Sequence, residues 1–591
     1  MLTYYRKPYK DKTTMKQNIY NTLKKNISMR IRPQWGMLCV SLCVGLLSFS
    51  SCSSDDAMEA LNTDPTKAAT MNPNSQLTTA ILETYGDLDQ VEIYRNYLYA
   101  FNQHLMGCWN TTNYGGRHTA DNTEMARIWT TFYDQGIKNL VDAEYATKNN
   151  ESRKNINAAL NIYKVYMMSI ITDAYGDVPY SEAGLGFIKG IANAKYDTQE
   201  SIYYDFFNKL DSAATQLSTA GDKLTGDVIY DGDVNQWKKL ANSLRLRYAM
   251  RISDVAPEKA KKEFLKALAA EGGIIETAAD DALIKYMDIA FSFGQDSYED
   301  FRGNALSKLL FGNDPANNPS YVCSTMFNQL RDTNDPRTFM ICRCYWDKLM
   351  SKTSTEGRID LTNEMLTQGR KFQPNQPGGF SWEPWPEGYD SDLLIAMAAN
   401  NPAIEAQGTT VDRETEPKLA NNFLKSDNPG VIITSAEVKL LLAEATLKGW
   451  LSTKGTVADL YKQGVREAMD FLHNNYNCEA VDDATFEAYI NENGIGHTTE
   501  QAKRAINTQA WILHFTNPSE CWANLRRSGY PQLKSPAEYG FAGNLVDGQQ
   551  IPVRMRYPVL ESSYNKANYE DALSRMNGKD SWNTRVWWDV K

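Results

Sequence analysis

The sequence predicts a mainly α-helical protein made of helix hairpins, with a loop-rich mixed α/β insert that carries short strands. Apolar residues recur at helical spacing over most of the chain, and the helical segments come in pairs. Residues 254–433 interrupt this pattern, because short alternating runs, such as 337–345, lie there among Gly- and Pro-rich stretches. We therefore expect a helical scaffold that holds an irregular insert.

Two of the predicted helix pairs lie before the insert. The first pair is 122–147 with 153–175, and the second is 199–218 with 234–253. Residues 153–175 are apolar on nearly every side, which is typical of a helix that is buried all round. The first half of the chain should therefore contain a closely packed set of long helices.

The third predicted pair follows the insert. Thr434 and Glu437 have the spacing of a capping box, so a helix should begin there. Residues 458–475 form its partner, and a further helix is predicted at about 500–516. Each pair has roughly the size of a tetratricopeptide unit, although the pairs are not in tandem.

A signal sequence is predicted near the N-terminus, in RIRPQWGMLCVSLCVGLLSFSSCSSDD at 30–56. Two arginines precede the apolar core at 37–49, which is shorter than the ~20 residues that span a membrane. Small residues and Cys52 follow, with Phe49 where a lipoprotein signal usually has Leu. We expect Cys52 to be lipidated and to anchor the chain to a membrane.

The predicted segments follow from this signal and from the helix pairs. They are an over-long start or tail at 1–28, the signal peptide at 29–51, a lipidated tether at 52–75, and one domain at 76–591 with its scaffold at 76–253 and 434–591 and its insert at 254–433.

The charge balance argues against polyanionic partners. Residues 1–51 contain nine of the 62 basic residues and one of the 72 acidic residues, so the chain from Cys52 on has a net charge of −18. Such a surface repels nucleic acid and anionic lipid. Neutral ligands, such as glycans, remain compatible with it.

Cysteine and histidine do not form a metal-binding pattern. Six cysteines follow Cys52 without a CxxC pair, and the five histidines are scattered, so we expect no zinc site. The cysteines are either buried free thiols or contribute one or two disulfides. We expect no cofactor, with a structural Ca²⁺ in an Asp-rich loop such as 227–233 as the open alternative.

Five segments occur in a characteristic order. They are DAYGDVPY at 173–180, WKKLANSLRLRYAMRI at 237–252, TSAEVKLLLAEATLKGW at 434–450, WILHFTNPSECWANLRRSGYP at 511–531 and IPVRMRYPVL at 551–560, and NTDP at 62–65 also fits. With the lipoprotein signal, this set resembles the SusD/RagB family of outer-membrane nutrient-binding lipoproteins, in particular its second large subgroup. The resemblance covers essentially the whole chain after Cys52.

Most residues of these motifs have structural explanations. Gly176 can adopt a positive φ to end a helix, and Asp177 can accept a hydrogen bond from a nearby backbone amide. Arginines that lie among apolar residues need carboxylate partners, so they should form ion pairs in the scaffold rather than bind ligand. These arginines are Arg245, Arg247, Arg251, Arg526 and Arg527.

The resemblance also implies a location, a cargo and a partner. It implies a lipid-anchored protein at the surface of the outer membrane that binds glycan, or peptide in some branches. It implies a SusC-like TonB-dependent outer-membrane barrel as the partner, for which the lipoprotein is the lid.

Ligand recognition is expected in three aromatic stretches, because sugars stack on Trp and Tyr rings and bond to polar groups at their rims. The stretches are 109–122, 377–392 and 291–304, and a Gly-Gly pair in the first suggests a mobile turn. The candidate residues are Trp109, Tyr114, Arg117, Phe380, Trp382, Trp385, Tyr389 and Tyr298.

An enzyme is not expected. The chain contains no nucleophile elbow, P-loop, HExxH or Rossmann fingerprint. A helical glycoside hydrolase needs two carboxylates held about 5–10 Å apart, and a single aromatic loop rarely sets such a pair. Binding of glycan is the preferred function, with binding of peptide as its alternative and the hydrolase last.

Overall fold

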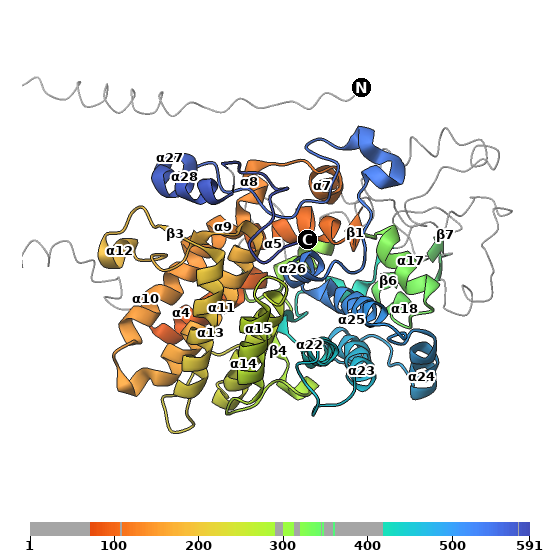
Figure 1. The fold of residues 1–591 in the computed structure, drawn as a ribbon, viewed down its shortest axis with the longest axis horizontal. Coiled ribbons are helices and arrows are strands. Elements are labelled where there is room, and N and C mark those ends of the chain that lie inside the picture. The colour runs from red at the N-terminus through yellow and green to blue at the C-terminus, as the bar shows by residue number, and fades with distance from the viewer. Residues whose placement is uncertain are drawn as a thin grey trace, which may run out of the picture. The chain divides into compact units, whose positions relative to one another are not determined.

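Figure 1 shows a computed structural model of the chain, which describes residues 71–106, 109–289, 300–311, 320–343, 345–347, 358–360, 418–576 and 578–591. These residues belong to one compact unit, Met71–Lys591. They are mainly helical, with strands of two to four residues, which confirms the predicted fold class. Among the described helices, none has the length and apolarity needed to cross a membrane.

The helices before the insert include both predicted pairs. They are α4 (Pro73–Gly86), α5 (Leu88–Ile93), α6 (Tyr99–Phe101), α7 (Trp109–Thr111), α8 (Asn122–Met125), α9 (Arg127–Thr131), α10 (Lys138–Thr147), α11 (Lys154–Tyr175), α12 (Gly186–Lys189), α13 (Gln199–Gln216) and α14 (Val234–Arg251), with π-helical turns η1 (Tyr94–Leu98), η2 (Thr112–Gly116) and η3 (Phe132–Ile137) and a 3₁₀ turn η4 (Glu151–Arg153). The predicted ends of α11, α13 and α14 are correct to within two residues.

Further helices lie in the insert and after it. They are α15 (Pro257–Leu268), α16 (Ala305–Phe311), α17 (Ser324–Asp332), α18 (Thr338–Ile341), α22 (Ser435–Leu447), α23 (Val457–Tyr476), α24 (Asp483–Glu492), α25 (Thr499–Leu513), α26 (Pro518–Ser528), α27 (Glu561–Tyr564) and α28 (Lys566–Arg575), with short turns η5 (Ala278–Asp280), η7 (Asn421–Leu424), η8 (His514–Thr516), η9 (Ala537–Phe541) and η10 (Ala542–Asn544). The predicted helices at 458–475 and 500–516 correspond to α23 and to α25 with η8.

The predicted helix at 122–147 is interrupted. It consists of α8, α9, the π-helical turn η3 and α10. Within η3, Gly136 lies so close to α11 that a Cβ atom there would stand 2.3 Å from the Met167 Cε atom. Close packing on α11 therefore changes the local winding, which the apolar periodicity alone does not indicate.

The short strands form small antiparallel sheets. One four-stranded sheet has the order β1 (Leu105–Met106), β5 (Tyr321–Val322), β9 (Lys418–Leu419) and β6 (Cys342–Arg343). The two-stranded sheets pair β10 (Gly430–Ile433) with β4 (Ala282–Ile284), β2 (Val178–Pro179) with β3 (Tyr196–Asp197), and β7 (Tyr345–Asp347) with β8 (Arg358–Asp360). The alternating run at 337–345 begins as helix α18 rather than as a strand, because Asp335 accepts the Arg337 and Thr338 amides and starts a helical turn.

Helix α14 joins the two halves of the scaffold. Helices α10, α11, α13, α14, α22 and α23 each pack on the next (Figure 1). The α22–α23 contact is close, since a Cβ atom at Gly464 would stand 2.9 Å from the Leu440 Cδ2 atom. Segments separated by 180 residues in sequence are therefore neighbours in the structure.

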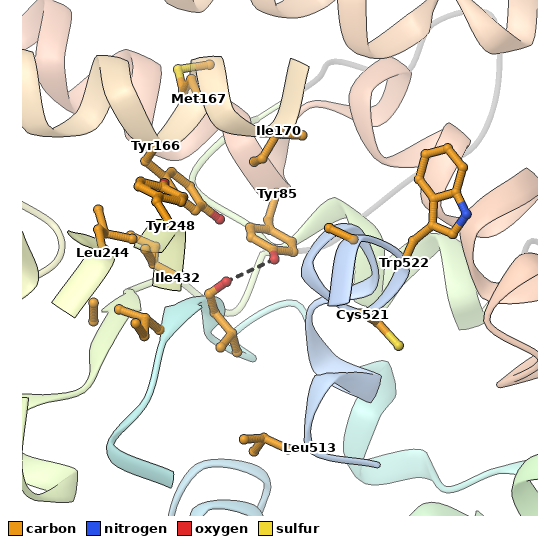
Figure 2. Packing of buried hydrophobic residues seen from close by; sticks show 14 of the residues in the cluster. Tyr85, Tyr166, Met167, Ile170, Leu244, Tyr248, Ile432, Leu513, Cys521 and Trp522 are labelled. Atoms are coloured by element: carbon orange, nitrogen blue, oxygen red, sulfur yellow. Dashed lines mark hydrogen bonds between the residues drawn. The ribbon is translucent and has the colours of Figure 1, made fainter. Parts of the chain in front are cut away.

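Two tyrosine hydroxyl groups are hydrogen-bonded inside the apolar core. Figure 2 shows these residues, Tyr85 and Tyr248, among buried apolar side chains. The Tyr85 hydroxyl donates to the Val431 carbonyl at 3.0 Å, and the Tyr248 hydroxyl is 2.9 Å from the Ser169 hydroxyl. These bonds connect α4 to β10 and α14 to α11 without leaving the hydroxyl groups unsatisfied.

Arg247 forms the most deeply buried ion pair of α14. Its guanidinium donates to the two carboxylate oxygens of Glu437 at 2.6 and 2.7 Å, and to the Ile432 carbonyl at 2.6 Å. Thr434 caps α22 by accepting the Glu437 amide. The Glu437 carboxylate, however, faces Arg247 instead of completing the predicted capping box.

Three other motif arginines form the predicted scaffold ion pairs. Arg251 binds Glu520 at 2.6 Å, Arg245 binds Asp211 at 3.0 Å, and Arg527 binds Glu444 at 2.7 Å. Arg526 differs, because it donates to the carbonyls of Trp522, Val553 and Asp173 and lies over two indole rings. Its role is still structural, but carbonyl oxygens and rings take the place of the expected carboxylate.

The DAYGDVPY motif is a helix end. Gly176 has φ 87° and ends α11, as predicted. Asp177 accepts the Gln199 amide at 2.8 Å, and its carbonyl accepts the Tyr557 hydroxyl at 2.6 Å. The motif therefore fixes the start of α13 and the C-terminal segment against the end of α11.

The Asp-rich loop at 227–233 is organised by N–H donors. The Asp227 carboxylate accepts the amides of Ile229 and Gly232, each at 2.9 Å, and the Trp237 indole N–H at 2.8 Å. These donors already engage the oxygens that a Ca²⁺ ion would need. Among the described residues, no group of three or more His, Cys, Asp and Glu side chains is placed to hold a metal.

The structure describes four of the cysteines. Cys323, Cys342, Cys478 and Cys521 are buried, and none of the four is in a disulfide. For these residues, the buried-thiol alternative is the correct one.

We expect Arg247→Met to lower the free energy of unfolding by about 3–5 kcal/mol, because it leaves a buried carboxylate without its main partner. Urea denaturation at pH 7 measures this loss. Lys266→Met is the matched control, since the Lys266–Asp211 pair is largely exposed and should contribute about 1 kcal/mol or less. The double variant Arg247→Met/Glu437→Leu should lose less than Arg247→Met alone, and equal losses would contradict this account.

We expect part of the acid sensitivity of the fold to come from Glu437. Burial alone would raise the pKa of Glu437, but Arg247 and His514 outweigh it and lower the pKa from 4.5 to about 2. A depressed carboxyl pKa stabilises the fold above pH 4.5, and this contribution is lost as the pH falls toward 2. Urea midpoints at pH 7, 4.5 and 3 should therefore fall less steeply for Glu437→Gln than for the native chain. Glu487→Gln, at an exposed pair, should keep the native slope.

Candidate functional site

The first candidate stretch, 109–122, follows strand β1 directly. It begins with α7, continues through the π-helical turn η2 and ends at α8. Trp109 is the first residue of α7, and its side chain lies outside the described part of the chain. Tyr114 and Arg117 are both half-buried, so each keeps part of its side chain at the surface.

Tyr97 anchors this stretch to the body of the protein. Its ring contacts the Tyr114 ring with centroids 5.8 Å apart. Its hydroxyl donates to the Thr119 carbonyl at 2.8 Å and accepts the Asp121 amide at 3.0 Å. Burial raises the pKa of Tyr97, so its hydroxyl keeps its proton at physiological pH.

The Gly-Gly pair of this stretch is packed, and the prediction of a mobile turn is wrong. A Cβ atom at Gly115 would stand 2.7 Å from the Ala100 Cβ atom and 2.8 Å from the Asn96 carbonyl oxygen. A Cβ atom at Gly116 would stand 2.7 Å from the Met106 sulfur. These glycines let η2 approach the preceding helical turns, which holds Tyr114 in a fixed place.

A C-terminal segment lies alongside the second half of the stretch. The Val546 amide donates to the Arg117 carbonyl at 2.9 Å, and the Asp547 amide donates to the His118 carbonyl at 3.1 Å. The Asp547 carboxylate accepts the Ala120 amide at 2.7 Å. Sequence reasoning missed this segment, because no local pattern links 546–547 to 117–120.

Aromatic rings pack against the buried side of the stretch. The rings of Tyr97, Phe101 and His118 each lie within 6.5 Å of the Trp582 ring, between centroids. The His118 ring nitrogen Nδ1 is 3.1 Å from the Gly548 carbonyl. Burial lowers the pKa of His118 to about 4, so the imidazole is neutral at physiological pH. The stretch is therefore a preformed surface on a rigid apolar base.

The first candidate stretch is attached to the four-stranded sheet. The edge strand β1 of this sheet leads into 109–122 within three residues. Arg343 in β6 and Lys418 in β9 are direct partners in the same sheet. The stretch 377–392 falls between these two residues in sequence and lies outside the described residues.

The other predicted site residues lie outside the described residues. They are Cys52, Tyr298, Phe380, Trp382, Trp385 and Tyr389. Their assignments stay predictions.

Family models match both halves of the chain. Residues 65–365 match the SusD-like model described as starch-binding associating with outer membrane. Residues 397–589 match the model described as SusD and RagB outer-membrane lipoprotein. The comparison with curated proteins gave no match.

Solved structures agree with these models. A SusD-like protein named Bacteroidetes AC2a is 45% identical, with a TM-score of 0.78, and a chitin-binding protein is 31% identical, with a TM-score of 0.71. A SusD homologue from Bacteroides uniformis is 24% identical, with a TM-score of 0.67, and shows the fold alone. Each comparison covers 88% of this chain and 100% of the other. The chain therefore belongs to the SusD-like family of outer-membrane nutrient-binding proteins.

Proposed function

We propose that this protein binds an oligosaccharide at the cell surface and delivers it to a SusC-like TonB-dependent barrel, for which it is the lid. The observation that carries the proposal is the 31% identity to a chitin-binding protein along the full length of that protein. Because that match is continuous, the two chains share the scaffold from which the candidate stretches arise.

The geometry at 109–122 supports a glycan as the ligand. A sugar presents an apolar C–H face, which stacks on an aromatic ring, and a rim of hydroxyl groups, which bonds to amides and charged groups. Tyr114 and Arg117 supply both kinds of contact from one fixed stretch. Since the stretch is already packed, little conformational entropy is lost on binding.

Binding without turnover is the activity we infer. The family is described by binding and by association with the outer membrane. The candidate stretch at 109–122 offers Asp121 as a carboxylate, but this side chain caps α8 by accepting the amides of Thr123 and Glu124. A hydrolytic pair of carboxylates would need acids from elsewhere.

We also propose that Cys52 is the first residue of the mature chain and that its lipid holds the protein to the outer membrane. The residues from Cys52 up to α4, which begins at Pro73, would then form the tether of the lid. The family description as an outer-membrane lipoprotein supports the anchor.

We expect chito-oligosaccharides to bind the purified protein, and Trp109→Ala and Tyr114→Ala each to weaken that binding about tenfold, through loss of ring stacking. Isothermal titration against a glycan panel and a peptide panel measures the affinities. Tyr564→Ala is the control, because this exposed tyrosine lies on α27, outside the stretch.

Two outcomes of these measurements would contradict the proposal, and a third would narrow the site. Heat with basic peptides but with no glycan would make peptide the cargo. Product formation after long incubation would make the protein an enzyme. Unchanged affinity in Trp382→Ala and Trp385→Ala would remove 377–392 from the site, and thermal melts of each variant exclude loss of folding as the cause.

We expect Cys52→Ala to release the protein from the outer-membrane fraction, because the acyl chains are its anchor. Cell fractionation and mass spectrometry of the mature N-terminus measure the release and the lipid. A native protein whose N-terminus is unlipidated, or a variant that stays in the membrane fraction, would contradict the assignment.

A further inference from the structure

A groove of about 290 Å³ lies on the scaffold between α10, α11, α13 and the loop at 180–189. Its volume is close to the lower end of the range of small-ligand sites. In Figure 1 these helices form the left side of the described domain, whereas α7 lies at its top. The groove is therefore separate from the candidate stretch at 109–122.

The charge of this groove is opposite to that of the whole chain. The lining includes four lysines and two acids, namely Lys148, Lys164, Lys189, Lys209, Glu144 and Asp205. The groove thus has a net charge of +2, while the chain has a net charge of −10. A concave site with one sign of charge attracts ligands of the other sign.

The acids of the groove are already engaged. Glu144 pairs with Lys164 and also with Lys209, whose Nζ atom is 3.5 Å away. Asp205 accepts the Tyr180 hydroxyl at 2.7 Å. One carboxylate therefore serves two ammonium groups, which leaves positive charge for an additional anion.

Lys164 lies at the buried bottom of the groove rather than at the protein surface. Its side chain is 13% exposed, and burial lowers its pKa despite the ion pair with Glu144. Because Lys164 shares the Glu144 carboxylate with Lys209, its ammonium group gains from a second anionic partner.

The groove is preformed by close packing of the 180–189 loop. Gly184 has φ 71°, and a Cβ atom there would stand 2.9 Å from the Val141 Cβ atom of α10. The amides of Tyr180 and Ser181 both donate to the Asp197 carboxylate. The loop is thus fixed both at its start and at its contact with α10. Little conformational entropy is therefore lost when a ligand binds.

We propose that this lysine groove binds the carboxylate or sulfate group of an acidic sugar residue. Val141, Leu185 and the half-exposed Tyr145 supply apolar surface for the C–H face of a sugar, and Ser181 supplies a hydroxyl group. The proposal rests on the proposed function in assigning the anion to a glycan. It adds a second site, and it names acidic glycans as a ligand class.

Titration of the purified protein in detergent with a galacturonate tetrasaccharide and with its methyl ester tests this proposal. We expect the acid to bind at least about tenfold more tightly than the neutral ester, with an affinity that falls as NaCl is raised. The double variant Lys189→Met/Lys209→Met should remove this difference, because both side chains reach the surface of the groove. Lys266→Met/Lys462→Met, at two exposed pairs outside the groove lining, removes the same two charges and is the matched control.

The outcomes separate this site from the one at 109–122. Chito-oligosaccharide affinity should be unchanged in the double lysine variant, and acid binding should survive in Tyr114→Ala. Equal affinity for acid and ester, or an unaffected double lysine variant, would overturn the proposal. Binding of phosphatidylglycerol vesicles or of inorganic sulfate without binding of the tetrasaccharide would also overturn it, because the anion would then not be a sugar.

Discussion

The pairing of buried arginines on α14 with carboxylates from distant parts of the chain is the constraint on which the scaffold depends. Arg247 and Arg251 lie one helical turn apart and reach Glu437 at the start of α22 and Glu520 at the start of α26. Charges of this kind are stable in the core only when both partners are present. These ion pairs therefore set the register of α22 and α26 against α14.

The same ion pairs also help to position the insert. Strand β10 ends one residue before Thr434, which caps α22, and it pairs with β4 from the start of the insert. The Ile432 carbonyl of β10 also accepts Arg247. The β4–β10 pair is thus held beside the Arg247–Glu437 ion pair.

Long periodic segments and motif arginines could be predicted from the sequence, because both follow local rules. Residues 153–175 are apolar all round and form a buried helix, and four of the five motif arginines pair with carboxylates. The predictions that failed depended on contacts between distant segments. The helix at 122–147 is interrupted beside Met167, Glu437 turns from its cap toward Arg247, and Gly115 meets Ala100 rather than forming a mobile turn. A local sequence pattern does not indicate which distant residue a side chain will contact. The contacts of Asp547 with 117–120 could not be predicted for the same reason.

The direct pairing of Arg343 with Lys418 has an evolutionary consequence. The 74 residues that lie between them in sequence join the two partners of a single rung. The entropy of closing a loop changes only logarithmically with its length, so residues added between these partners cost little closure entropy. Selection can therefore change the length of this part of the gene at a small cost to the pairing of β6 with β9. In a family whose members meet many different nutrients, this tolerance lets the sequence between the two strands diverge while the strand pairing is inherited unchanged.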